Sequence, residues 1–130
     1  MKQIIVGIYS VGFEDVEIVL REGTGGEFYN CPEKGHCPRI KIGADVNNWR
    51  DIVGTFLHET VEFVFNRLGC RYDNVYDMGK DSSSYLFVAS HPALSDTCAR
   101  VGECAAVALP DLCREWKRWK GKKLKLGGGI

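Results

Sequence analysis

The chain has 130 residues, of which 45% are hydrophobic and 26% are charged, and its formal net charge is zero. This length and composition predict one globular domain with enough apolar side chains to bury a core without disulfides. The zero net charge excludes a chain that binds nucleic acid through overall positive charge. No apolar run approaches the roughly 18 residues of a membrane-spanning helix, and the first apolar run is too short for a signal peptide.

The charge is unevenly distributed along the chain. Residues 111–130 carry seven basic and two acidic side chains, a net of +5, and residues 1–110 carry the compensating net of −5. The basic segment is either a weak patch for nucleic acid or another partner, or a solvated helix end with well-placed cations. We favour the second interpretation, and we expect nucleic-acid binding, if there is any, only through this segment.

Three strands are predicted in the first third of the chain. The apolar run at residues 1–9 and the alternating stretch at 13–21 predict a hairpin that turns at Gly12. Residues 22–38 are rich in glycine and predict a loop. Residues 39–44 alternate again between polar and apolar side chains, which predicts the third strand.

The predicted loop contains Cys31, His36 and Cys37 within seven residues. These side chains could form half of a zinc knuckle or, in an oxidising compartment, a disulfide. A structural zinc site takes four ligands, and no second Cys/His cluster at the usual spacing completes this one. Without an export signal, we expect all six cysteines to be reduced thiols and the protein to be cytoplasmic.

Residues 49–68 predict one long amphipathic helix, with Asp and Asn as candidate caps just before it and Gly69 as the cap at its end. At 100° per residue, one arc is apolar and predicts the face that packs on the core: Trp49, Ile52, Val53, Phe56, Leu57, Phe63, Val64 and Leu68. The opposite arc is polar: Asp51, Thr55, His58, Glu59, Glu62 and Asn66.

A second long helix is predicted after a polar loop at residues 71–84, which holds one short strand at most, and a brief apolar run at 85–89. Apolar and cysteine side chains recur at three- and four-residue spacing over residues 92–119. Pro110 lies inside this pattern and is expected to kink or break the helix. Residues 120–130 are basic and rich in glycine, and we expect a disordered tail.

The polar arc of the first helix carries the candidate chemistry. His58 and Glu62 are four residues apart and lie on one face, with Glu59 beside them. The zinc motif H-E-x-x-H places two ligands at this spacing and uses the intervening Glu as general base. Here a carboxylate takes the second ligand position, which zinc accepts but which leaves a bound water less acidic. The same spacing is also an ordinary surface pair on a helix.

The order of three strands, a motif-bearing helix, a loop and a second helix resembles the minimal zincin-like metallopeptidase domain. More narrowly, it resembles small phage and prophage proteins of metallopeptidase-like type. The resemblance rests on residues 40–43, Trp49, residues 57–59, Glu62 and the Ser90–His91 pair, and it covers residues 1–119. It implies an α+β domain in which a small sheet of three to four strands packs on two long helices.

The resemblance also implies a function and a site. Zn²⁺ would be held by His58, Glu62 and His91, and Glu59 would activate a water for peptide hydrolysis. His91 could equally be a solvated residue in the first turn of the second helix. Glu103, in the middle of that helix, is the alternative third ligand.

Two further acidic residues, Asp73 and Asp77, are less constrained candidates for the third ligand. The rival interpretation of the whole chain is a non-catalytic zincin-like binding protein with a structural metal or none. If phage-encoded, such a protein would act on host factors in the host cytoplasm. Both interpretations imply a peptide or protein partner and no membrane.

Overall fold

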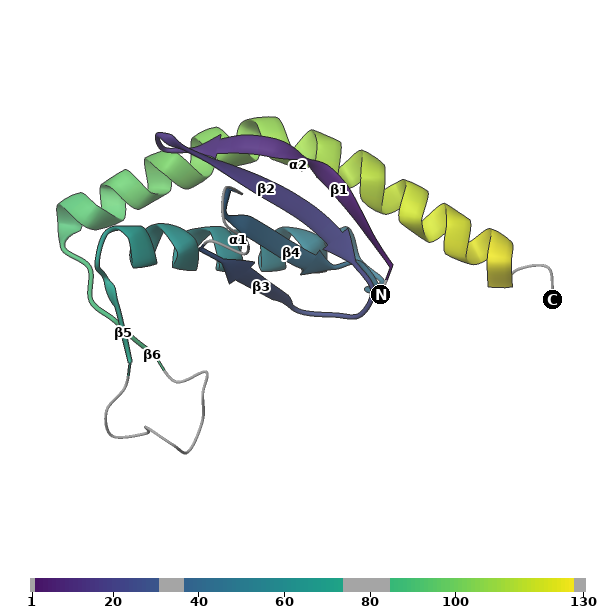
Figure 1. Cartoon of the computed structure of the whole chain (residues 1–130), viewed down its shortest axis with the longest axis horizontal. Coiled ribbons are helices and arrows are strands. Elements are labelled where there is room, and N and C mark those ends of the chain that lie inside the picture. The colour runs from purple at the N-terminus through teal and green to yellow at the C-terminus, as the bar shows by residue number, and fades with distance from the viewer. Residues whose placement is uncertain (1, 31–36, 74–84, 128–130) are drawn as a thin grey trace.

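The computed structural model describes residues 2–30, 37–73 and 85–127. Its elements are, in chain order, strands β1 (Gln3–Val11), β2 (Glu14–Arg21), β3 (Gly26–Tyr29) and β4 (Arg39–Gly43), helix α1 (Trp49–Arg67), strands β5 (Arg71–Asp73) and β6 (Tyr85–Phe87), and helix α2 (His91–Gly127). Figure 1 shows the two long helices on one face of a four-stranded sheet. The predicted α+β class, with a small sheet on two long helices, is therefore confirmed.

The sheet has the strand order β1-β2-β4-β3. β1 and β2 form the predicted antiparallel hairpin, whereas β4 lies parallel to β2 and pairs on its other side with antiparallel β3. Alternate residues of β2 and β4 are fully buried against the helices: Val16, Ile18, Leu20, Ile40 and Ile42. This arrangement makes β3 a short edge strand, and α1 packs against both β3 and β4.

β3 corrects the prediction that residues 22–38 form a loop. Glycine lowers strand propensity, and for that reason the sequence of this stretch predicts a loop. At Gly26, however, the missing side chain is what brings strand and helix together. A Cβ there would lie 2.6 Å from Cγ2 of Thr55 on α1, so only glycine lets the edge strand lie this close to the helix.

The core lies between the sheet and the helices. α1 contributes Ile52, Phe56 and Phe63, and α2 contributes an apolar stripe: Val101, Cys104, Ala108, Leu112, Trp116 and Trp119. The indole Nε1 of Trp116 donates to the backbone oxygen of Ala44 at 3.1 Å. This bond ties α2 to the segment that connects β4 with α1.

Both helices differ in detail from the prediction. Asn48 precedes α1 but its side chain makes no capping hydrogen bond, whereas Gly69 has the left-handed φ of +73° expected of a residue just past a helix end. α2 continues through Pro110, so the proline does not break the helix, which bends over the sheet (Figure 1). The helix also extends past residue 119 to Gly127, so the predicted tail is helical as far as this residue.

Several sequence predictions fall outside the described residues. Cys31, His36 and Asp77 are among these, so the zinc-knuckle and disulfide alternatives are not addressed. The described cysteines are free thiols: Cys37, Cys70, Cys98, Cys104 and Cys113. Among the helices of the described part, none is both long and apolar enough to cross a membrane.

Candidate metal centre

α1 buries most of the apolar arc that its sequence predicts, but the limits of the buried face differ from the prediction. Glu59 and Thr60 are buried, whereas Leu57, predicted to pack on the core, is 40% exposed. The cause is the position of α1, which packs against α2 and also beneath the sheet edge at β3 and β4. The helix therefore turns Glu59 toward the sheet and leaves Leu57 on the outer side.

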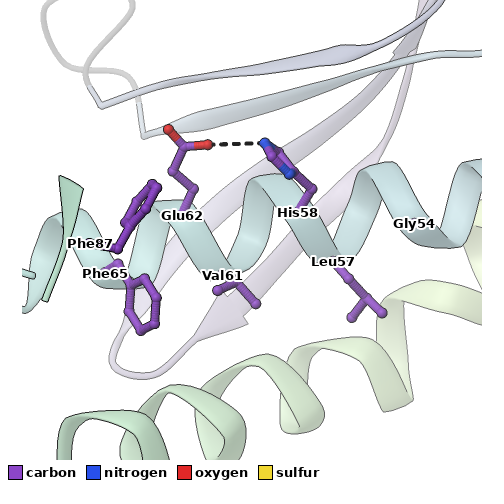
Figure 2. Close-up of a pocket in the computed structure, with 7 residues that line it drawn as sticks. All are labelled: Gly54, Leu57, His58, Val61, Glu62, Phe65 and Phe87. Atoms are coloured by element: carbon purple, nitrogen blue, oxygen red, sulfur yellow. Dashed lines mark ion pairs between the residues drawn. The ribbon is translucent and has the colours of Figure 1, made fainter. Parts of the chain in front are cut away.

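Three side chains of the predicted polar arc come together on α1. His58, Glu59 and Glu62 each offer one ligand atom, and these three atoms lie within 4.8 Å of one another. Nε2 of His58 is 3.2 Å from Oε2 of Glu62 and 3.9 Å from Oε1 of Glu59. Figure 2 shows His58 and Glu62 on the same side of the helix, inclined toward each other.

The three side chains differ sharply in exposure. The His58 side chain is 70% exposed, whereas those of Glu62 and Glu59 are only 14% and 8% exposed. The cluster is therefore open to solvent on the histidine side and closed on the side of Glu59. An ion or a water molecule could enter past His58 and meet the two carboxylates behind it.

The edge strand β3 explains the burial of Glu59. A Cβ on Gly26 would lie 3.0 Å from Cγ of Glu59, so the strand lies directly against this side chain. Phe28 continues the contact by packing edge-on against Phe63 of α1, with the ring centroids 5.9 Å apart. β3 thus seals the inner side of the cluster.

Burial raises the pKa of Glu59 above its ordinary value, because the charged carboxylate loses solvation. The neighbouring carboxylates of Glu62 and Glu27 raise this pKa further, while His58 and Arg71 lower it. A carboxylate with a raised pKa is a stronger proton acceptor than an ordinary one. Glu59 therefore has the chemical environment of a general base.

Arg71, the first residue of β5, is a member of the site that sequence reasoning missed. Its Nε lies 3.3 Å from Oε1 of Glu62, and its guanidinium stacks over the Phe28 ring at 5.1 Å. Glu62 thus faces His58 with one oxygen and Arg71 with the other. No sequence motif indicates Arg71, because this residue lies in β5 and not at helical spacing from His58 and Glu62.

The candidate third ligands do not join this group. His91 is the exposed first residue of α2, and Glu103 is exposed further along the same helix. Glu103 lines a separate cavity together with Ile8 and Cys104. Within the described residues, the metal-ligand group consists of His58, Glu59 and Glu62 alone. The role of His91 or Glu103 as third ligand stays a prediction.

The donor atoms of the group suit a divalent metal ion. Zinc binds imidazole nitrogen and carboxylate oxygen, and both kinds of donor are present here on adjacent turns of one rigid helix. Arg71 holds the second oxygen of Glu62, which is the kind of outer contact that orients a ligating carboxylate. The residues present therefore offer nitrogen and oxygen donors of the kinds that zinc takes.

Comparisons of the chain with models of known protein families, with curated proteins and with solved structures found no match. The functional interpretation accordingly rests on the chemistry of His58, Glu59 and Glu62 as the fold arranges them.

Proposed function

We propose that this chain is a zinc-dependent, zincin-like peptidase that hydrolyses peptide bonds at the HETVE segment of α1. The observation that carries the proposal is the convergence of an imidazole and two carboxylates within 4.8 Å on successive turns of one helix. In this proposal His58 and Glu62 hold the ion, and His91, which lies outside the cluster in this structure, is the candidate third ligand. Glu59 is the general base.

In the proposed reaction the ion would activate the carbonyl and the water, and the protein side chains transfer the proton and orient the ligand. Zinc bound here would polarise the scissile carbonyl and lower the pKa of a water molecule beside it. Glu59 accepts a proton from the attacking water and then delivers it to the amine that leaves when the C–N bond breaks. The burial that raises the pKa of Glu59 supports both proton transfers. Arg71 keeps Glu62 oriented through its contact with Oε1.

Elemental analysis of the purified protein tests the metal centre. We expect about one zinc per chain in the wild type, and a loss of at least ten-fold in zinc affinity in His58→Ala and in Glu62→Gln, because each variant removes a donor atom. His91→Ala and Glu103→Ala identify the third ligand by the same measurement. A wild-type protein that takes up no zinc, even when zinc is added back, would contradict the proposal.

Glu59→Gln tests the catalytic part separately. This variant keeps the shape of the side chain but removes the proton acceptor. We expect it to retain zinc and to lose peptide hydrolysis by a factor of about a hundred or more. Unchanged hydrolysis in Glu59→Gln would show that another group is the base.

The ion pairs of Glu62 favour a second candidate function, a non-catalytic binding protein. His58 and Arg71 both contact this carboxylate, so Glu62 has partners on both oxygens without a metal ion. A chain in which this pairing is the resting state would keep the fold for binding a peptide or protein partner. Zinc uptake together with Glu59-dependent hydrolysis favours the peptidase, and the absence of both favours the binding protein.

A further inference from the structure

An apolar groove of about 450 Å³ runs along α1 beside the candidate metal centre. Seven residues line it: Gly54, Leu57, His58, Val61, Glu62, Phe65 and Phe87. In Figure 2, His58 and Glu62 lie on one side of the helix and Leu57 and Val61 on the other, while Phe65 and Phe87 close one end. The groove and the metal centre therefore share two walls, His58 and Glu62.

The walls of the groove are apolar and partly open to solvent. Leu57 is 40% exposed and Phe87 is 44% exposed. The Phe65 and Phe87 rings lie 5.8 Å apart and are tilted by 42°, which leaves aromatic surface for a third apolar group. An apolar groove that opens to solvent and has a few polar groups at its edge is the usual form of a ligand site.

We propose that this groove binds a large apolar side chain of an extended peptide and thereby selects the bond that the metal centre cleaves. The inference rests on the proposed peptidase function and adds the class of substrate. The groove has the volume of a small ligand pocket, and its walls offer a bulky hydrocarbon side chain mainly apolar contacts.

The geometry gives the occupant a defined position. Leu57, Val61 and Phe65 follow one another at four-residue spacing, so they form a ridge along the helix that is inclined by about 26° to its axis. A peptide that lies along α1 places its side chain against this ridge and its backbone toward His58 and Glu62. Continuity between ridge and metal centre therefore favours a peptide over an occupant that fills the groove alone.

Cleavage of a series of blocked peptides tests the proposal. The peptides are acetyl-Gly-Gly-X-Gly-Gly-amide with X as Phe, Leu, Ala or Asp, and kcat/KM is measured with the zinc-loaded protein. We expect Phe and Leu to exceed Ala and Asp by about ten-fold or more, because a filled apolar pocket discriminates by this order. Leu57→Asn should abolish most of the preference while retaining zinc. Equal cleavage of all four peptides would overturn the proposal.

Val107→Asn is the matched control. Val107 is an aliphatic side chain on α2, 62% exposed, and it lines the separate cavity near Glu103. This variant makes the same polar change to an exposed aliphatic side chain without touching the groove. We expect it to preserve the ratio between the Phe and Ala peptides. Loss of the ratio in both variants would mean that a general effect, and not the groove, determines the preference.

A second readout separates the groove from the peptidase activity. The ring signals of Phe65 and Phe87 are followed by NMR while the same peptides are added to the zinc-free protein. Shifts caused by the Phe peptide and not by the Ala peptide support the groove even if no hydrolysis occurs, in which case only the peptidase proposal fails. Hydrolysis of all four peptides at equal rates would support the peptidase proposal and contradict the groove proposal. A wild-type dimer that Leu57→Asn dissociates would assign the groove to a second copy and overturn the inference.

Discussion

Glu59 links the proposed chemistry to the stability of the fold. Its carboxylate is buried, and desolvation raises its pKa in the folded chain above the value in the unfolded chain. The folded state therefore binds this proton more tightly than the unfolded state does. Between the unfolded and the folded pKa, stability falls as pH rises, and above both values the ionised side chain lowers the free energy of unfolding.

Glu59→Gln should therefore stabilise the zinc-free protein. The amide keeps the shape of the side chain and carries no charge, so the desolvation cost of the carboxylate disappears. We expect a higher free energy of unfolding than in the wild type at pH 7, and a difference that shrinks as pH is lowered toward 4. Urea unfolding at several pH values measures both. A variant that is less stable than the wild type at pH 7 would show that Glu59 is well solvated or strongly paired.

At the scale of residues, the sequence predicts which side chains belong to the site better than it predicts their burial and their contacts. The spacing of His58 and Glu62 places both side chains on one helix face, and the structure brings them within 3.2 Å. The same spacing predicts that Glu59 is solvated, but β3 covers it. Arg71 follows the helix in sequence with no periodic relation to it. The burial of Glu59 and the contact of Arg71 with Glu62 depend on which elements pack together, and local sequence patterns do not contain that information.

At the scale of elements, the contact between β3 and α1 determines the inner wall of the site. Gly26→Ala places a methyl group 2.6 Å from Cγ2 of Thr55 and 3.1 Å from the backbone oxygen of Lys41. We expect this variant to lose about 1–3 kcal/mol of unfolding free energy, the usual cost of overpacking. It should also slow peptide hydrolysis, because the displaced strand no longer holds Glu59, the proposed general base. Chemical denaturation and a peptide-hydrolysis assay check the two effects.

Gly102→Ala is the control for this substitution. Gly102 lies in α2, and a Cβ there meets no atom within 4 Å. Alanine should stabilise the helix by up to about 1 kcal/mol, because glycine is the poorer helix former. If Gly26→Ala were as harmless as Gly102→Ala, the edge strand would not lie against α1 as closely as described.

Sequence patterns predict the long elements and miss the short or irregular ones. The helices and the β1–β2 hairpin follow from periodicity that extends over many residues. β3 has four residues and begins with glycine, so its propensity is weak and its pairing with β4 determines its structure. Pro110 should disturb a helix on local grounds, yet Ala108 and Leu112 on either side of it are fully buried. Their packing holds α2 together across the missing hydrogen bond.

At the scale of the whole molecule, zinc binding should appear as added stability. A ligand that binds only the folded state stabilises it by about 2.7 kcal/mol at a free concentration one hundred times its Kd. We expect the melting temperature of the wild type to rise with zinc by several degrees, and that of His58→Ala to stay constant. Thermal unfolding monitored by circular dichroism measures this shift. An equal rise in both proteins would locate the stabilising zinc elsewhere.

The overall architecture was predictable only at coarse resolution. The order of strands and helices along the chain indicates an α+β fold, but not that β4 lies between β2 and β3.

The charge distribution read from the sequence likewise does not show which charged side chains pair with one another. Arg114 and Arg118 contribute to the basic segment of residues 111–130, yet both form ion pairs with Glu115. Part of the basic charge is therefore paired within the helix, while the net charge of the segment remains +5.

The tryptophans give the protein a built-in optical probe. All three of them, Trp49, Trp116 and Trp119, lie where the start of α1 meets α2, and the Trp49 and Trp116 rings are 5.9 Å apart. His58 lies about 14 Å further along the helix axis. Intrinsic fluorescence therefore reports on the helix junction, and the tryptophans are remote from the candidate metal centre. Unfolding can be followed by light emission while zinc or a peptide is titrated, with little direct quenching from the bound species.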